Sequence, residues 1–259
     1  MQALPSESSY SINIGNPDLK PERQSGYEIG GDFYYGDNFF VEFTFFDQLF
    51  LDGIANDPSI DDLLTIKQEY WYINLGQIIN KGIEVAAKTR IFDIFDISAN
   101  YTYLDSRWGK DSIRQTDPIY EGFYDKGERR TDVPSQTGNV SISLNLPGTK
   151  YTSDKGGSIS LDVSYIGERK GRNWLLYYDG LYNPDIQQVT YYSSEILMNY
   201  DSYYNARLRL NYSLTNNVSF YLDIRNLNNH TDISRSITEP ALGRQIICLL
   251  YTSPSPRDA

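Results

Sequence analysis

The chain has 259 residues, 23 tyrosines, 11 phenylalanines and a formal net charge of −11. No stretch approaches the roughly 18 consecutive apolar residues that a spanning helix needs, which excludes a helical membrane protein. The acidic balance and the lack of a basic cluster argue against nucleic acid as a partner. One cysteine, Cys248, excludes an intrachain disulfide. One histidine, His230, leaves little material for a triad or a metal centre, so we expect no catalytic residue, cofactor or metal site.

The segment 16–23 reads NPDLKPER and is expected to be a rigid, irregular lead-in to the first strand. Pro17 and Pro21 fix φ and bar both a helix and a central strand. From Tyr27 to Tyr35, apolar residues then alternate with glycines and acidic residues. This period of two predicts a β-strand with one apolar and one polar face.

The same alternation recurs eight more times along the chain. The expected strands cover 39–46, 70–91, 95–103, 139–146, 159–165, 204–214, 218–225 and 243–247. The run 70–91 is expected as one strand, about twice the usual globular length. A tilted membrane strand that extends above the bilayer would account for it.

The connections between these strands alternate between short and long. Tight turns are expected at 36–38, 92–93 and 215–217, and a medium one at 147–157. Long loops are expected at 51–69, 108–131 and 168–201, and another passes through 239–240. Bacterial outer-membrane barrels have this organisation, with brief periplasmic turns and extended outer loops. Tyrosines near the strand ends also match the aromatic girdles of such barrels.

A soluble sandwich or propeller shares the strand period but not the composition of the polar face. A solvated face accepts Lys and Glu freely, whereas this one is rich in Ser, Asn, Gly and mixed charge, as a plugged lumen would be. We therefore expect an all-β fold, an antiparallel transmembrane β-barrel of meander topology that is partial, with about nine strands.

Twelve charged residues fall on the expected lumen face. We expect them to pair with one another or with a plug, because buried charges are tolerated only when paired. They are Glu28, Asp32, Glu42, Glu84, Lys88, Arg90, Asp96, Asp162, Arg207, Arg209, Asp223 and Arg225.

Six short motifs, in order along the chain, resemble those of TonB-dependent outer-membrane receptors. The lead-in is similar to the family's NPxLKPE signature through Asn16, Pro17, Leu19, Lys20, Pro21 and Glu22. The second motif, the family's NxG and KGxE strand, is matched by Asn74-Leu75-Gly76 followed by Lys81-Gly82-Ile83-Glu84. The remaining resemblances are Tyr101-Thr102-Tyr103, Val133-Pro134, Arg225-Asn226-Leu227 and Gly243-Arg244.

The resemblance implies a barrel of roughly 22 strands around a plug. Nine strands would leave two edges with unpaired backbone groups in lipid, where each group costs several kcal/mol. We therefore expect residues 1–247 to be the C-terminal portion of such a barrel, without the plug and the earlier strands. The N-terminus has no signal-peptide pattern. Residues 248–259 break the alternation and resemble a translated sequencing adapter, so we expect a non-native tail outside the fold.

The resemblance also implies a function in the bacterial outer membrane. A TonB-dependent receptor takes up a scarce, bulky ligand such as a ferric siderophore, cobalamin or a glycan. The implied partners are outer-membrane lipid, the TonB complex acting through the N-terminal plug region, and an extracellular small molecule or glycan.

Candidate ligand-binding residues are the aromatic and cationic residues in or at the base of the long loops. Aromatic rings there could stack on sugar or catecholate rings, or they could simply form the interface girdle and pack the loops. The candidates are Tyr70, Trp71, Tyr72, Arg107, Trp108, Trp174, Tyr177 and Tyr178.

Two other functions remain open at this stage. One is a passive porin-type channel. The other is a barrel enzyme such as an outer-membrane lipase, which needs a serine and a histidine close together on the outer face. His230 lies in a turn-like run with no serine motif nearby.

Overall fold

The structure, a computed structural model, describes residues 10–57, 67–74, 76–109, 126–150, 155–172, 197–231 and 242–252. All the regular elements in these ranges are β-strands. Within the same ranges, no helix is long and apolar enough to cross a membrane.

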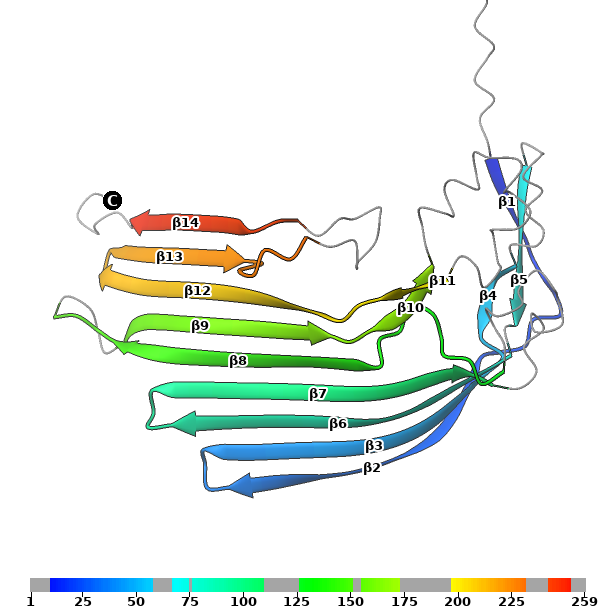
Figure 1. The fold of residues 1–259 in the computed structure, drawn as a ribbon, viewed down its shortest axis with the longest axis horizontal. Helices are drawn as coiled ribbons and strands as arrows, with labels where there is room; N and C mark the ends of the chain where they lie inside the picture. Colours follow the sequence, from blue (N-terminus) through cyan, green and yellow to red (C-terminus); the bar gives the residue numbers. More distant parts are fainter. Residues whose placement is uncertain are drawn as a thin grey trace, which may run out of the picture.

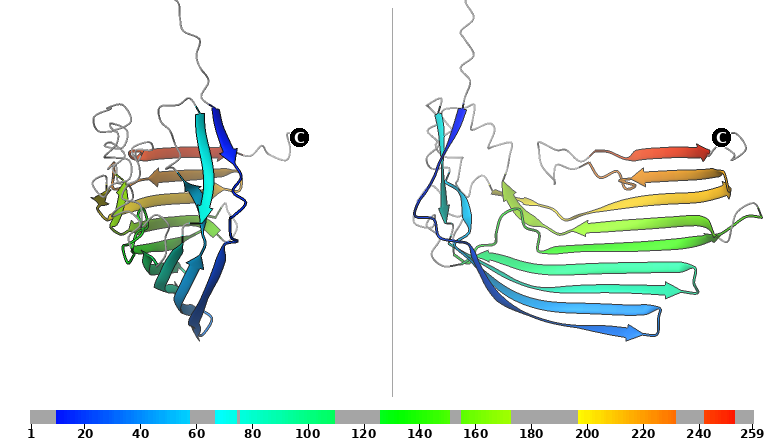
Figure 2. Two further views of the ribbon diagram at one scale, coloured as in Figure 1. Left: turned by 90° about the vertical axis from the view of Figure 1, so that its right-hand side faces the viewer. Right: turned by 180° about the vertical axis from the view of Figure 1, so that it is seen from behind.

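Nine strands form one continuous sheet in which each strand pairs antiparallel with its neighbours along the chain (Figure 1). In order across the sheet they are β2 (Arg23–Tyr35), β3 (Phe39–Leu51), β6 (Gln77–Ile91), β7 (Phe95–Trp108), β8 (Gln136–Pro147), β9 (Lys155–Ile166), β12 (Tyr203–Thr215), β13 (Val218–Arg225) and β14 (Gln245–Thr252). The expected all-β, nine-stranded antiparallel meander is confirmed. The sheet is curved, as the views in Figure 2 show.

Five short strands lie at the end of the sheet that carries the long connections (Figure 1). In one small sheet β5 (Lys67–Asn74) pairs parallel with β1 (Tyr10–Ile14) and antiparallel with β4 (Ile54–Asp57). In another, β10 (Arg169–Arg172) pairs with β11 (Leu197–Tyr200). The long connections expected at 51–69 and 168–201 therefore contain regular structure of their own.

The opposite end of the sheet carries tight turns. Between β6 and β7, Phe92 and Asp93 have φ values of 53° and 55°, and Ile94 N–H donates to the Ile91 carbonyl. Positive φ at both central residues is the type I′ geometry, whose twist matches that of the flanking strands. This turn therefore sets the β6–β7 register over 14 consecutive residue pairs.

The register places apolar residues opposite apolar ones and polar residues opposite polar ones across the sheet. Leu208 of β12 faces Leu161 of β9 on one side and Ile224 of β13 on the other, and the adjacent Arg209 faces Asp223. Large apolar side chains on one face are exposed, among them Phe33 at 58%. Because so much apolar surface would be costly in water, this face is suited to contact with lipid.

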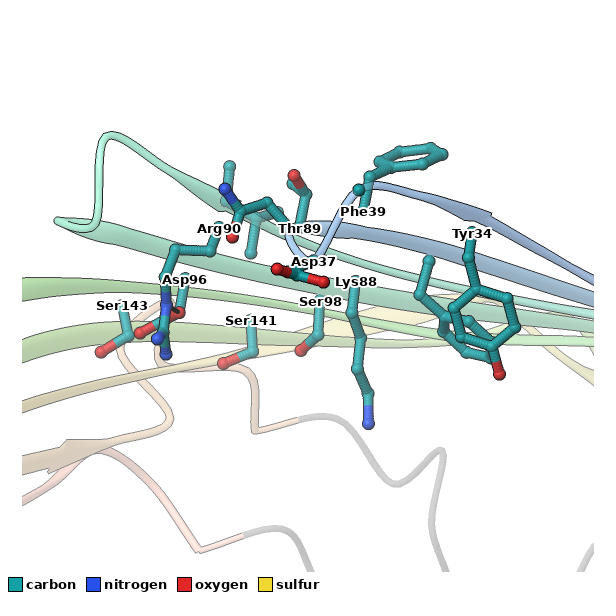
Figure 3. Close-up of a pocket in the computed structure, with 14 residues that line it drawn as sticks. Tyr34, Asp37, Phe39, Lys88, Thr89, Arg90, Asp96, Ser98, Ser141 and Ser143 are labelled. Carbon is teal, nitrogen blue, oxygen red and sulfur yellow. Dashed lines mark hydrogen bonds and ion pairs between the residues drawn. The ribbon is translucent and has the colours of Figure 1, made fainter.

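The polar face is hollowed near the tight turns, where a cavity of about 710 Å³ is lined by residues of β2, β3, β6, β7 and β8. Figure 3 shows Lys88, Ser98 and Ser141 extending to one side of the sheet, and Phe39 and Thr89 to the other. The alternation in sequence thus becomes an alternation in space.

The expectation of one strand over 70–91 was wrong. The chain forms β5 and β6 as separate strands in different sheets, with Gly76 between them at φ 89°. This left-handed conformation is easily accessible only to glycine, and it turns the chain from the small sheet into the large one. Apolar alternation continues through the corner, and periodicity alone therefore does not reveal it.

Several strand limits also differ from those expected, and two of them bear on the sequence pattern. The first strand of the large sheet begins at Arg23, before the expected Tyr27. The last strand continues through Thr252 and pairs with β13 over its whole length, so Cys248 to Thr252 form part of this strand. The alternation is nevertheless lost there, because Ile247 and Leu249 fall on the polar face opposite Asp223 and Tyr221. The side-chain pattern predicted that the strand ends at Ile247, but backbone pairing with β13 extends it to Thr252. A non-native origin of residues 248–259 stays a prediction.

A facing test follows from the register. Leu208→Arg and Phe220→Arg should each prevent barrel assembly of a full-length parent receptor, because a cation on the lipid face at mid-bilayer costs about 2–4 kcal/mol. Asn211→Arg, on the polar face of β12, should assemble normally. The measurement is the heat-modifiable folded fraction in detergent, and equal damage by both classes would contradict the assigned faces.

Candidate functional site

Cross-strand ion pairs run along the polar face of β12 and β13. Arg207 donates to both oxygens of Asp223 at 2.7 and 2.8 Å, and Arg225 Nε donates to the same carboxylate at 2.9 Å. The Asp223 side chain has 0% exposure. A buried carboxylate is tolerable here because two guanidinium groups replace its hydration.

Two similar groups continue this pairing toward β6. Asp162 of β9 accepts from Arg209 at 2.7 Å and from the Ser141 hydroxyl at 2.8 Å. On β7, Asp96 accepts from Arg90 at 2.6 Å and from the Asn145 amide at 2.9 Å. Neutral pairs lie between them: Asn100 with Asn139, Ser143 with Ser160, and Ser213 with Ser219. We call this set of charged and neutral pairs the polar ladder.

The polar ladder accounts for seven of the twelve charges expected on the lumen face. They pair with one another, as predicted: Arg90, Asp96, Asp162, Arg207, Arg209, Asp223 and Arg225. Glu28 accepts a hydrogen bond from Gln48 at 2.8 Å. Among the described residues, the other four form no ion pair: Asp32, Glu42, Glu84 and Lys88. Pairing of these four with a plug stays a prediction.

The lead-in motif fastens the loop end of β2 to its neighbours. Asn16 donates through its side chain to the Tyr72 carbonyl at 2.7 Å and accepts from Asp18 N–H at 3.0 Å. The Glu22 carboxylate accepts from Ile54 N–H at 2.7 Å. Three segments far apart in the chain are thereby held together by one short irregular stretch.

Asn74 is the centre of this arrangement. Its side-chain oxygen accepts from Lys20 N–H at 2.9 Å, and its amide donates to the carbonyls of Lys20 and Asp52 at 2.9 and 2.6 Å. Asp52 N–H donates to Gly76, and the Asp52 carboxylate pairs with Arg23 at 2.6 Å. We call this group the β2–β6 clamp. It satisfies irregular backbone groups where regular pairing ends.

A second clamp closes the loop end of β12 and β13. Asn226, at 5% exposure and φ 51°, donates to the carbonyls of His230 and Leu242 and accepts from His230 N–H. Arg244 donates to the Leu227 carbonyl at 2.7 Å. The motif residues Asn226, Leu227 and Arg244 thus build a turn, and the His230 ring stacks on Tyr203 at 4.9 Å.

Gly82 lies on the polar face of β6, between β3 and β7, where there is no room for a side chain. A Cβ at this position would meet the Tyr103 carbonyl oxygen and the Phe46 ring, both closer than van der Waals contact allows. The glycine leaves room for Phe46 to lie across β6. Glu84, two residues later, is exposed on the same face.

The eight predicted ligand-binding residues are divided among several places. Tyr70, Trp71 and Tyr72 are on β5, in the small sheet, and the Tyr72 carbonyl is used by the β2–β6 clamp. Arg107 and Trp108 end β7. Trp174, Tyr177 and Tyr178 lie outside the described residues.

Arg107 and Trp108 lie beside further cationic residues. Arg107 donates to Asp105 at 2.8 Å and to the Gly127 carbonyl. Trp108 has 5% exposure, and the Arg130 guanidinium lies 5.6 Å from its ring centre. Sequence reasoning did not select Arg129 and Arg130. Their signal is an adjacent arginine pair in an acidic chain, at the base of a long loop.

The described residues offer no metal centre. No group of three or more His, Cys, Asp or Glu side chains in those ranges is placed to hold an ion.

The polar ladder predicts unequal costs for two aspartates. Asp223→Ala should lower the free energy of unfolding by about 2 kcal/mol, because it leaves two arginines facing one another without their shared, fully buried carboxylate. Asp96→Ala should cost less than about 1 kcal/mol, since both members of that pair are solvent-exposed. Denaturant unfolding of the full-length receptor measures both, and equal costs would contradict a special role for Asp223.

The β2–β6 clamp predicts a local effect of Asn74→Leu. The Lys20 amide loses its acceptor, and each lost hydrogen bond is worth about 1 kcal/mol. Hydrogen exchange at Lys20 should accelerate while strand amides in β7 stay protected. Asn211→Leu, outside the clamp, is the control. Unchanged exchange at Lys20 would show that Asn74 does not hold the lead-in.

Solved structures similar to this chain include siderophore receptors and receptors for the uptake of ferric complexes. The siderophore receptor PirA from Acinetobacter baumannii is 19% identical, with a TM-score of 0.64 over 93% of this chain and 33% of that one. The ferric-catecholate import receptor Fiu from E. coli K12 is 16% identical, with a TM-score of 0.59 over 92% and 28%. The ferric yersiniabactin uptake receptor FyuA from Yersinia pestis is 17% identical, with a TM-score of 0.54 over 81% and 25%.

At these identities the similarity establishes the fold, and the chain spans a quarter to a third of the length of those receptors. A search of curated proteins found no match. A scan of protein-family models matches residues 3–227 to the TonB dependent receptor-like β-barrel family. Members of this family are receptors and transporters of the bacterial outer membrane, not enzymes, so the barrel-enzyme alternative is removed. The chain belongs to the TonB-dependent receptor β-barrel family.

Proposed function

We propose that this chain is the C-terminal part of the barrel of a receptor that takes up a scarce, bulky ligand across the outer membrane with energy delivered through TonB. The observation that carries the proposal is the family match over residues 3–227, on a sheet with a lipid-suited face and a polar face. On this proposal, the preceding part of the receptor supplies the plug and the TonB-binding segment.

The polar ladder is compatible with a transport wall. Its charged groups are neutralised across the strands, so a plug or ligand moving past them meets few groups that demand a partner. Four charges without ion pairs lie instead on β2, β3 and β6. We propose that this part of the wall contacts the plug, because fixed charges favour a partner that pairs with them.

A ferric siderophore is the ligand class that the similar structures favour. Receptors for ferric yersiniabactin, for ferric catecholates and for a siderophore all share this fold. Cobalamin and glycans stay as alternatives within the same mode of uptake. No covalent step is needed, since binding and release suffice.

Uptake by cells that express the full-length receptor tests the proposal. Accumulation of radiolabelled ferric siderophore should require TonB and the proton gradient, and should stop on addition of a protonophore. The purified receptor should be nearly silent in planar bilayers, because a plug closes the barrel. Large constant conductance with TonB-independent uptake would favour the passive porin-type channel.

The aromatic-rich segment 173–192 generates a separate prediction, made from its sequence. Deleting it from the full-length receptor should weaken ligand binding and leave the barrel folded, since outer loops carry recognition and add little to the strand ladder. Ligand affinity and thermal melting are measured together. Unchanged affinity with a lowered Tm would assign Trp174, Tyr177 and Tyr178 to loop packing.

A further inference from the structure

A cationic cleft lies at the loop end of the sheet, between the end of β7 and the start of β10. Its volume is about 350 Å³. Cationic side chains from three segments line it: Arg107, Arg129, Arg130, Arg169 and Lys170. Among the described residues, two carboxylates line the same cleft, those of Glu128 and Glu168. This local excess of positive charge stands in a chain whose net charge is −11.

The carboxylates near the cleft compensate these cations only in part. Arg107 and Arg129 share the single carboxylate of Asp105, at 2.8 and 3.6 Å. Lys170 approaches Glu128 at 3.8 Å, which is a loose pair between two half-exposed side chains. Exposed pairs of this kind are weak and easily exchanged for a better partner.

Arg130 is held by packing, not by an acidic partner. Its guanidinium lies over the ring of Trp108, and its backbone N–H donates to the Ser106 carbonyl at 3.0 Å. Among the described residues, its buried Nε has no hydrogen-bond partner. Burial lowers the pKa of Arg130 below its ordinary value, and no neighbouring carboxylate raises it.

A half-buried guanidinium with a buried, unbonded N–H is costly, and such a group in a native structure calls for an explanation. An anion bound in the cleft would supply the counter-charge that this guanidinium lacks among the described residues. Phosphate-type oxyanions match the fork of guanidinium donors, and an aromatic ring behind the guanidinium keeps it oriented toward the cleft. The volume of the cleft suits such a group with part of the molecule that carries it.

We propose that this cleft binds a phosphate-type oxyanion, with Arg130 as its central ligand and Arg129 and Lys170 at its rim. The phosphate can belong to the headgroup of an outer-leaflet lipid or to a free solute. Both sources present the same chemistry to the cleft. This proposal does not rest on the proposed uptake function, because a direct binding measurement tests it without any transport.

Binding to the full-length receptor in neutral detergent tests the site with two probes. One probe is inorganic phosphate, and the other is mixed micelles that contain lipid A. Arg130→Gln should weaken binding by at least about tenfold, since charge-assisted hydrogen bonds are lost. Arg129→Gln, which changes an exposed side chain, should weaken it less. Lys88→Gln, a cation at the opposite end of the sheet, should bind as wild type does.

A further variant separates a binding role from a structural one. Arg130→Met keeps an apolar stem over Trp108 and removes the buried, unbonded Nε. It should therefore lose binding while its Tm equals or exceeds that of the wild type. Added salt should weaken binding of either probe, because the contact is between charges partly open to water.

The outcomes distinguish the two sources of the phosphate, and they show whether the cleft binds an oxyanion at all. Binding of lipid A micelles alone assigns the phosphate to lipid, and binding of inorganic phosphate with the same variant pattern assigns it to a solute. Both results support the proposal. It is overturned if neither probe binds, if Arg130→Gln and Arg129→Gln both bind as wild type does, or if Lys88→Gln weakens binding as much as they do.

Discussion

Pairing of every backbone N–H and C=O is the constraint on which this structure depends. Hydrocarbon offers no water to replace a missing partner, so a spanning segment must complete its hydrogen bonds within the protein. Seven of the nine strands do this by antiparallel pairing on both sides, whereas β2 and β14, at the edges of the described sheet, pair on one side only. The side chains on the polar face follow the same rule: Asp223, the most deeply buried carboxylate described, receives two arginines. Apolar and polar residues thus alternate along each strand because one face contacts lipid and the side chains on the other face must form hydrogen bonds or ion pairs.

Regular pairing ends where the strands leave the sheet, and there the side chains take over. The Asn74 side chain accepts a hydrogen bond from one backbone N–H and donates to two backbone carbonyls, so it satisfies groups that a neighbouring strand would otherwise pair. Asn226 does the same at the other side of the sheet, from a left-handed conformation that asparagine tolerates. The short sequence motifs shared with the family are accordingly explained by local geometry. Asn16, Asn74, Asn226 and Arg244 hold loop bases in place.

The sequence predicted the strands that a two-residue period determines. It did not predict features that depend on backbone conformation, backbone pairing or contacts between distant residues. Strand number, order and facing follow from alternation, so the nine-stranded sheet and the tight turns were predictable. The corner at Gly76 was hidden, because apolar alternation continues across a break that only the backbone conformation reveals. The extension of β14 through Thr252 was missed since backbone pairing with β13 does not depend on side-chain pattern. Arg130 gave no signal beyond its neighbour Arg129, because its significance lies in contact with Trp108 across a loop.

The contrast between Asp223 and Arg130 separates the two tasks of this surface. Both are charged groups removed from water, and both incur a desolvation cost. Asp223 is compensated by Arg207 on the adjacent strand β12 and by Arg225 on its own strand β13, so it serves the stability of the wall. Arg130 has an aromatic ring and a backbone contact but no carboxylate among the described residues, so its cost is not returned within them. Proteins keep such local inconsistencies chiefly at functional sites. The wall around Asp223 is therefore satisfied by its own residues, whereas the loop end around Arg130 is where we propose that an anion binds.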